Sequence, residues 1–302
     1  MTAFLLLIAC LLLGAIVARI ARPPVTLASN LNWWVIHIAL PALVLALVPK
    51  IEFHWGLWYL AASMWLVFFG AWALFACIGK WRRWSRARIG ALTLVCGLGN
   101  TSFIGYPMLE ALRGQEGLAL GVIADQLGCF VMLAIGGAII TSIYSTSTPR
   151  APIHLSSIAG RVLFFPAFVA LVIGATAGAW GGWPSAVDLI LTRIGNTLVP
   201  IALFSVGLQM RLQLALGQVD AVVVGLAFKL ALAPLAIYVL GLLFGISGMT
   251  LTVSVLQAGM APMISAAILA EQHQLEPRLA NLVLIVGIVL SFATVPLLNA
   301  ML

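Results

Sequence analysis

The polar residues best suited to bind a small solute interrupt two apolar stretches of the chain. The first interruption lies in GLGNTSFIGYPML (97–109), and the second lies in GMAPM (259–263). Amides and hydroxyls at these places can donate and accept hydrogen bonds, while an aromatic ring and a thioether could add an apolar wall. The predicted solute-binding residues are Asn100, Thr101, Ser102, Tyr106, Pro107, Gln257, Met260, Pro262 and Ser265.

Most of these residues also have a structural explanation. The amide of Asn100 could satisfy backbone groups freed by the interruption instead of contacting a solute. The hydroxyls of Thr101 and Ser102 could cap a helix end. Tyr106 and Met260 could simply pack. We expect Asn100 to contact the solute and the prolines of both interruptions to shape the site.

Two ionisable residues, Asp125 and Lys229, lie deep in other apolar stretches. A charge at the centre of a bilayer costs about 2.5–3.5 kcal/mol on insertion scales, so both should face protein or a water-filled cavity. We hypothesise that Asp125, helped by Gln126, orients or neutralises Lys229, and that protonation or anion binding changes this pairing. The alternative is a static structural pair.

Nothing in the sequence predicts a catalytic set, a metal site or a cofactor. It contains no HExxH sequence and no serine in a nucleophile-elbow pattern. The cysteines fall in apolar runs at spacings that match no metal motif, so we interpret them as packing residues. They are Cys10, Cys77, Cys96 and Cys129. We therefore expect a protein that is not an enzyme and that needs no cofactor.

The composition of the chain indicates that most of it lies in a lipid bilayer. Of its 302 residues, 63% are hydrophobic and 8% are charged, and the mean hydropathy is +1.17. About 20 apolar residues cross a bilayer. The chain offers ten such runs, and the first has its arginines after it, which is typical of a span and not of a cleaved signal peptide. The expected spans are 3–20, 31–48, 55–79, 89–112, 118–144, 162–180, 187–210, 219–244, 251–271 and 278–302.

Lysine and arginine residues predict the orientation of these spans. They gather in the connections after spans 1, 3, 5, 7 and 9, whereas the opposite side has Lys50 and Arg113. The positive-inside rule makes the odd connections cytoplasmic and both termini extracytoplasmic, in the inner or plasma membrane of the cell. The formal charge of +7 is thus an orientation signal and does not indicate nucleic-acid binding. The densest connection, KWRRWSRAR (80–88), determines topology or alternatively binds lipid headgroups.

The two halves of the chain repeat. Pro41 corresponds to Pro200, and Pro107 corresponds to Pro262, at nearly constant spacing. Each half has five expected spans, an odd number, so the second half must enter the membrane from the opposite face. The sequence predicts an all-α membrane protein with ten transmembrane helices in a 5+5 inverted repeat, in which helices 4 and 9 are broken and cross. The first repeat is 1–145, a short cytoplasmic linker is 146–160, and the second repeat is 161–302.

Paired interruptions in the two halves of a membrane protein indicate the binding site of a transporter, near the bilayer midplane. Broken helices also present free N–H groups at their N-termini. These groups, with the partial positive charge of the helix dipole, suit an anion such as a carboxylate. The residues therefore predict a carrier of a small anionic solute.

Four motifs, taken in order, resemble the auxin efflux carrier family, which includes the plant PIN-type carriers and bacterial transporters of malonate, malate and similar acids. The connection between spans 5 and 6 is short, as in bacterial members. The motifs are Asn100-Thr101-x-x-x-Gly105-x-Pro107-x-Leu109, ALFSVGLQM (202–210), Lys229 with Pro234, and QAGMAPM followed by AEQHQLEP (257–277).

This resemblance implies a scaffold of spans 1, 2, 6 and 7 and a transport domain of spans 3–5 and 8–10. It also implies elevator-type movement of the transport domain and a homodimer through the scaffold. We expect secondary active or facilitated transport of a small organic anion, such as malonate, malate or an auxin-like acid, with membrane lipid as the other partner. The alternatives are a channel or sensor on the same fold and a sodium-coupled symporter of the bile-acid type. Sodium is disfavoured because mid-span carboxylates are scarce.

Overall fold

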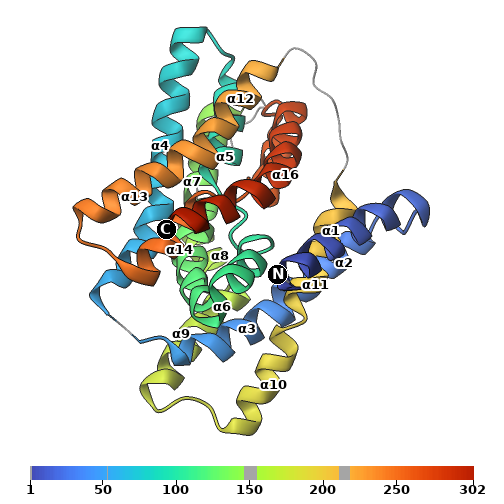
Figure 1. The fold of residues 1–302 in the computed structure, drawn as a ribbon. Helices are drawn as coiled ribbons and strands as arrows, with labels where there is room; N and C mark the ends of the chain where they lie inside the picture. The colour runs from blue at the N-terminus through green and yellow to red at the C-terminus, as the bar shows by residue number, and fades with distance from the viewer. Residues whose placement is uncertain (1, 53, 146–154, 211–217) are drawn as a thin grey trace. The chain divides into compact units, whose positions relative to one another are not determined.

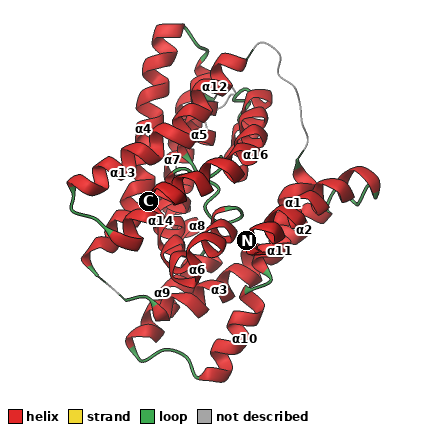
Figure 2. Cartoon of the chain, in the orientation of Figure 1, coloured by secondary structure: helices red, strands yellow, loops and turns green. Residues whose placement is uncertain are grey.

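The fold is known from a computed structural model that describes residues 2–52, 54–145, 155–210 and 218–302. Within these ranges the regular structure is helical, apart from one isolated β-bridge, and Figure 2 shows helices joined by loops and turns. Residues 146–154, most of the expected linker, lie outside the described ranges. The all-helical class is confirmed for the described chain.

The helices group into two compact units, each described by itself below (Figure 1). The helices α6 (Gly105–Ile123) and α8 (Leu155–Leu163) cross the sequence boundaries between the units. Unit 1 is Met1–His54, Ser102–Val122 and Gly160–Arg211, and unit 2 is Trp55–Thr101, Ile123–Ala159 and Leu212–Leu302.

Unit 1 is built around a close approach of its first and last helices, α1 and α11. A Cβ atom on Gly207 would overlap the Leu11 carbonyl oxygen, and one on Gly14 would overlap the Phe204 carbonyl oxygen. Both positions therefore need glycine for the two backbones to touch. The helices of unit 1 besides α6 are α1 (Thr2–Ile20), α2 (Leu27–Trp34), the π-helical turn η1 (Val35–Ala39), α3 (Leu40–Leu47), the 3-10 turn η2 (Val48–Lys50), α9 (Pro166–Ala179), α10 (Ser185–Gly195) and α11 (Leu198–Gln209).

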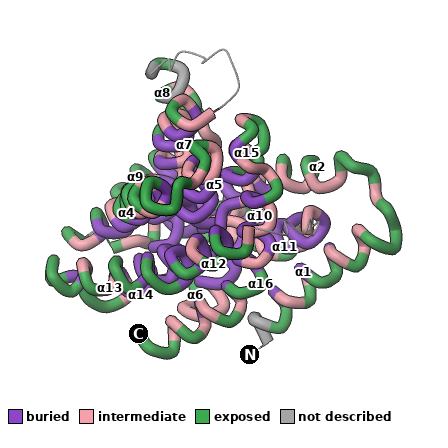
Figure 3. Tube along the Cα trace, turned by 90° about the horizontal axis from the view of Figure 1, so that it is seen from above, coloured by how far each residue is buried: buried purple, intermediate pink, exposed green. Residues whose placement is uncertain are grey.

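Unit 2 has α5 at its core. Every residue of this helix from Gly90 to Gly97 is buried (Figure 3), and α4, α7, α15 and α16 pack against it. Such burial explains why the segment reads as continuously apolar without an amphipathic pattern. The helices of unit 2 are the 3-10 turn η3 (Trp55–Leu57), α4 (Trp58–Arg82), α5 (Arg86–Gly97), the π-helical turn η4 (Ala124–Cys129), α7 (Phe130–Tyr144), α12 (Val219–Ala227), the π-helical turn η5 (Phe228–Leu232), α13 (Ala233–Leu243), α14 (Gly248–Ala258), α15 (Ile264–Gln272) and α16 (Pro277–Met301).

Two prolines inside long helical segments lie next to π-helical turns. Pro41 follows η1 by two residues, and Pro234 follows η5 by two residues. A proline cannot donate a backbone hydrogen bond and collides with the carbonyl of the preceding turn. The wider π-helical turn accommodates that collision without ending the helix.

The described helices account for several membrane crossings. Six helical segments are long and apolar enough to span a bilayer by length and composition. Shorter apolar helices are Leu5–Ile20, Pro166–Ala179 and Gly248–Ala258. Large apolar side chains also stay exposed, such as Val223 at 59% and Leu235 at 57%, as a lipid-facing surface requires. A multi-pass helical membrane protein is thereby supported, while the number of ten spans and the inverted repeat stay predictions.

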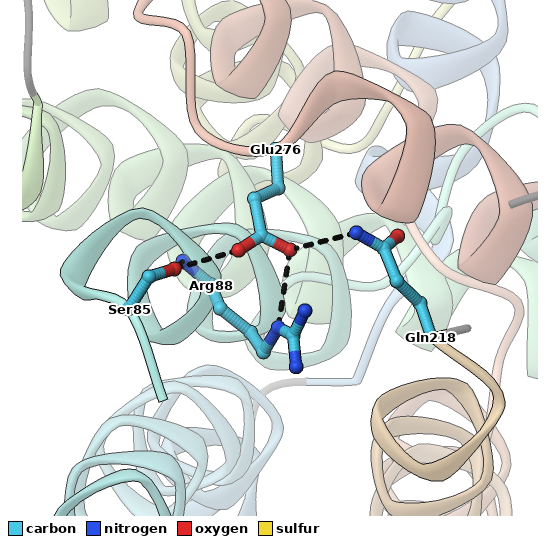
Figure 4. Close-up of polar contacts among 4 residues, drawn as sticks. All are labelled: Ser85, Arg88, Gln218 and Glu276. Carbon is cyan, nitrogen blue, oxygen red and sulfur yellow. Dashed lines mark hydrogen bonds and ion pairs between the residues drawn. The ribbon is translucent and has the colours of Figure 1, made fainter. Parts of the chain in front are cut away.

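A cluster of polar side chains joins three connections at one end of unit 2 (Figure 4). Ser85 Oγ caps α5 by accepting from the Arg88 backbone N–H and donates to Glu276 Oε1 at 2.6 Å. Arg88 Nε and Gln218 Nε2 both donate to Glu276 Oε2, at 3.1 and 3.2 Å. These residues come from the expected connections after spans 3, 7 and 9. The cluster therefore places three odd-numbered connections at the same end of unit 2.

The Glu276→Ala variant should lower the stability of the protein by about 1–2 kcal/mol. Glu276 binds three side chains, and each hydrogen bond contributes roughly 0.5–1.5 kcal/mol. Partial exposure, 19% for its side chain, screens part of this gain. The melting temperature of the purified protein in detergent measures the effect. Glu271→Ala, at an exposed position on α15, is the matched control, and equal melting temperatures for the two variants would contradict the expectation.

Candidate solute-binding site

Both predicted interruptions are real breaks in the helices. The first runs from Leu98 to Ile104, between α5 and α6, and the second runs from Gly259 to Met263, between α14 and α15. Pro262 lies inside the second break. Pro107 lies in the first turn of α6 and not inside its break, because the first turn of a helix tolerates a residue without an N–H donor.

Within unit 2 the two breaks meet backbone to backbone. Gly99 and Pro262 form an isolated antiparallel β-bridge, and the Asn100 N–H donates to the Ala261 carbonyl at 2.7 Å. Backbone groups that leave a helix inside a membrane must be satisfied by protein or by water in a cavity. Each break thus supplies part of the hydrogen bonding that the other lost. We call this meeting of residues 98–101 with 259–263 the crossing.

The crossing is surrounded by buried polar atoms that have spare hydrogen-bonding capacity. Gln257 uses its Nε2 to donate to the Thr101 carbonyl at 3.3 Å, but its Oε1 has no partner among the described residues. The same is true of Asn100 Nδ2, Gln126 Oε1 and Ser254 Oγ. Leaving a buried polar atom unpaired costs about 1–3 kcal/mol. Several such atoms around one crossing indicate a place where a solute completes the hydrogen bonding.

Asp125 holds the first break in place. Its side chain is buried in η4, and it accepts hydrogen bonds from Thr101 Oγ1 and, at 2.7 Å, from Gln126 Nε2. Donors of this kind stabilise a buried carboxylate. Gln126 and Thr101 therefore both bind the Asp125 carboxylate, while the role of Asp125 and Gln126 in orienting or neutralising Lys229 stays a prediction.

Lys229 lies beside both breaks. Its side chain is 1% exposed, and its Nζ donates to the carbonyl of Ala258 at 3.0 Å. Ala258 is the last residue of α14, where free carbonyls and the negative end of the helix dipole favour a cation. A Cβ atom on Gly99 would lie 3.1 Å from the same Nζ, so a side chain at this position would crowd the ammonium.

The predicted pairing of Asp125 with Lys229 stays a prediction. Asp125 acts on the first break through Thr101, and Lys229 acts on the end of α14 through the Ala258 carbonyl. Both residues therefore hold backbone at or beside the crossing. Ion pairs elsewhere in the described chain are Lys50–Asp188, Arg82–Asp220 and Arg88–Glu276.

Two residues of the site were missed by sequence reasoning. Cys129, interpreted as a packing residue, is buried, and its Sγ contacts the Gly99 carbonyl at 3.2 Å. Ser254 lies three residues before Gln257 and is fully buried. Both follow from helical spacing, since Cys129 comes four residues after Asp125, and residues three or four apart share one helix face. Spacing from the predicted polar residues would have found them.

The remaining predicted site residues divide between the two units. In unit 2, Met260 is buried in the second break and Ser265 is exposed on the first turn of α15. In unit 1, Tyr106 and Pro107 are buried, whereas Ser102 is half-buried.

Comparison with known proteins decides the family. The chain matches the family described as membrane transport protein over residues 2–299, nearly its whole length. It belongs to that family. This is the auxin efflux carrier family that the four motifs resemble. The membrane transport proteins of this family are transporters and not enzymes.

Two archaeal relatives of this membrane transport protein extend the comparison. One, named an uncharacterized transporter, comes from Methanothermobacter thermautotrophicus and is 26% identical over 285 residues, covering 89% of this chain and 87% of the relative. Another, also named an uncharacterized transporter, comes from Methanocaldococcus jannaschii and is 25% identical over 200 residues, covering 64% of this chain and 61% of the relative. Both support a transporter, and their names specify no solute.

Proposed function

We propose that this protein transports a small organic anion across the membrane, as a secondary active or facilitated carrier. The observation that carries this proposal is the crossing, where two broken helices of a membrane protein enclose polar atoms with spare hydrogen-bonding capacity. The solute class is a carboxylate, such as malonate, malate or an auxin-like acid. The donors and charges of the crossing favour this class over a cation.

Three features of the crossing favour an anion. Asn100 Nδ2 is an unused donor, and the buried Lys229 ammonium lies beside Gly99, the residue before Asn100. The N-cap residue of α15, Met263, makes no side-chain cap hydrogen bond, and the first N–H groups of a helix suit an anion. The carboxylate of Asp125 is already engaged by Thr101 and Gln126. A solute carboxylate therefore meets donors and a positive charge.

The transport cycle in this proposal is alternating access of the elevator type. A transport domain of spans 3–5 and 8–10 carries the crossing past a scaffold of spans 1, 2, 6 and 7, through which two copies form a homodimer. Asp125, Gln126 and Lys229 couple the occupancy of the site to this movement, because they hold both strands of the crossing. The ten spans lie in the inner or plasma membrane with both termini extracytoplasmic.

Uptake into proteoliposomes of purified protein tests the proposal. The panel is malonate, malate, lactate and indole-3-acetate, each with and without sodium and pH gradients. Saturable uptake of one acid supports a carrier, and dependence of that uptake on sodium would favour the sodium-coupled alternative. Flux that never saturates would favour a channel. No flux of any acid would remove the basis for an anionic solute.

The Asn100→Ala variant should reduce the uptake of the transported acid by about tenfold or more. It removes one donor to the solute carboxylate, and a hydrogen bond to a charged group contributes roughly 1.5–3 kcal/mol. Initial rates over a range of solute concentrations measure the loss. Asn30→Ala, the same substitution at an exposed position of α2, is the control. Equal uptake by both variants would show that Asn100 serves the backbone of the break and not the solute.

A further inference from the structure

The basic residues of segment 80–88, where α4 ends and α5 begins, fall into two sets. Arg82 pairs with Asp220 at 3.3 Å, and Arg88 pairs with Glu276 at 3.1 Å. The other cations, Lys80, Arg83 and Arg86, are exposed, and none of them belongs to an ion pair of the described residues. The positive-inside rule depends only on how many positive charges a connection carries. It does not explain why two of these residues form ion pairs and three do not.

The three cations without an ion pair line one cleft of unit 2, with a volume of about 540 Å³. Its aromatic and apolar walls come from the ends of α4 and α7 and the start of α5, and no carboxylate lies among its lining residues. These residues are Ala76, Gly79, Lys80, Arg83, Trp84, Arg86, Ile89, Ile143 and Tyr144. The cleft therefore concentrates positive charge that the protein itself leaves unneutralised.

Contacts within the protein fix Arg86, one of the three cations of the cleft, in position. Arg86 Nη2 donates to the Ile143 carbonyl at 2.7 Å, and its guanidinium lies 5.9 Å from the centre of the Tyr144 ring. Tyr144 in turn accepts a hydrogen bond from Trp72 Nε1 at 3.0 Å. Arg83 ends α4 in the left-handed conformation, with φ of 55°, and turns the chain toward α5. A preorganised guanidinium loses less freedom when it binds an anion.

The surroundings of the cleft indicate where its anion comes from. The cleft lies at the end of α4, which belongs to the segment Trp55–Arg82, long and apolar enough to span a membrane. The end of such a segment is expected at the membrane interface. Trp81, beside it in sequence, is 78% exposed, as an aromatic residue at the interface is. Ala76, Ile89 and Ile143 supply apolar surface next to the cations. Charge beside apolar surface suits an amphiphile better than a free ion.

We propose that this cleft binds the phosphate of an anionic phospholipid headgroup. Lys80, Arg83 and Arg86 hold the phosphate, Trp84 and Tyr144 contact the glycerol region, and the apolar wall contacts the start of an acyl chain. Phosphate and guanidinium match each other in charge and hydrogen-bonding geometry. The site is separate from the crossing, and the proposed transport function can fail without affecting it.

Native mass spectrometry of the purified protein, titrated with phosphatidylglycerol or with zwitterionic phosphatidylcholine, tests this site. We expect phosphatidylglycerol to bind the unaltered protein at least tenfold more tightly, and high salt to weaken that preference. An equal affinity for the two lipids would overturn the proposal. Glycerol 3-phosphate and inorganic phosphate form the soluble arm. If either competes with phosphatidylglycerol at equal concentration, the site serves a soluble phosphate and the lipid assignment is wrong.

The double variant Arg83→Gln/Arg86→Gln should bind phosphatidylglycerol about 25-fold more weakly, since each basic residue near an anionic headgroup contributes about a fivefold change in Kd. Arg19→Gln/Arg22→Gln, which removes two exposed arginines of unit 1, is the matched control and should bind the lipid unchanged. A similar loss in both variants would show a non-specific charge effect and overturn the proposal. If the cleft variant does not fold, the salt dependence of lipid preference in the unaltered protein decides the question.

Discussion

The Lys229→Gln variant should lose at least tenfold of its uptake of the transported acid while keeping its helical content and membrane insertion. Lys229 is the buried cation beside the crossing. Its Nζ donates to the Ala258 carbonyl at the end of α14 and lies close to Gly99. Hydrogen bonds to charged groups contribute about 1.5–3 kcal/mol, which corresponds to roughly a 10- to 150-fold change in rate or affinity. Glutamine can still donate to the Ala258 carbonyl, so the substitution removes the charge more than the contact.

Uptake and melting temperature, measured on the same preparations, separate a functional role of Lys229 from a structural one. Lys50→Gln is the matched control, because it removes a lysine whose ammonium forms an exposed ion pair with Asp188 in unit 1. We expect the control to transport normally. Unchanged uptake by Lys229→Gln would rule out the ammonium as the charge that balances the solute. A large drop in its melting temperature would instead identify the lysine as part of the support for α14.

The Gly207→Ala variant should destabilise the protein by about 1–3 kcal/mol or more. A single Cβ atom at this position overlaps the Leu11 carbonyl oxygen and lies 2.9 Å from the Ala15 backbone nitrogen. Overpacking in a core costs about 1–3 kcal/mol when side chains can yield. Here the obstruction is backbone, so α1 and α11 must move apart. The loss of contact then extends along the length of both helices.

Thermal unfolding in detergent, followed by size-exclusion chromatography, measures this effect. Gly160→Ala in α8 is the matched control, because a Cβ atom there meets nothing within 4 Å. Alanine is the better helix former, so the control should be neutral or slightly stabilising. Equal stability of the two variants would mean that α1 and α11 pack less closely than described. The same two variants also test whether unit 1 tolerates change independently of the crossing.

The two breaks could be predicted from the sequence because their residues are exceptional. Asn100 with two neighbouring hydroxyls, and Pro262 three residues after Gly259, stand out within otherwise apolar runs. In lipid such residues have few explanations other than a break covered by protein. Whether Pro107 lies inside the break could not be predicted, because proline is equally compatible with a break and with the first turn of the following helix.

The partners of the buried charges could not be predicted. A sequence argument that considers only charge relates Asp125 and Lys229 to each other. The structure adds further partners, Thr101 for Asp125 and the Ala258 carbonyl for Lys229, which depend on how distant segments meet. A sequence does not show which backbone carbonyl will accept a hydrogen bond, because every residue has one. The contact of Cys129 with the Gly99 carbonyl could not be predicted for a related reason, because a cysteine in an apolar run is usually a packing residue.

The π-helical turns also have a consequence for how this chain tolerates insertions and deletions. Asp125 lies in η4 and Lys229 lies in η5. A π-helical turn contains one residue more than an α-helical turn, so each is equivalent to a single inserted residue. Removing the extra residue from η5 would therefore restore a regular helix and keep α12 and α13 in register with each other. A deletion inside α12 or α13 would instead rotate everything beyond it by about 100°. The π-helical turns are thus the places where these helices best tolerate the loss of a residue, provided that Asp125 and Lys229 themselves are kept.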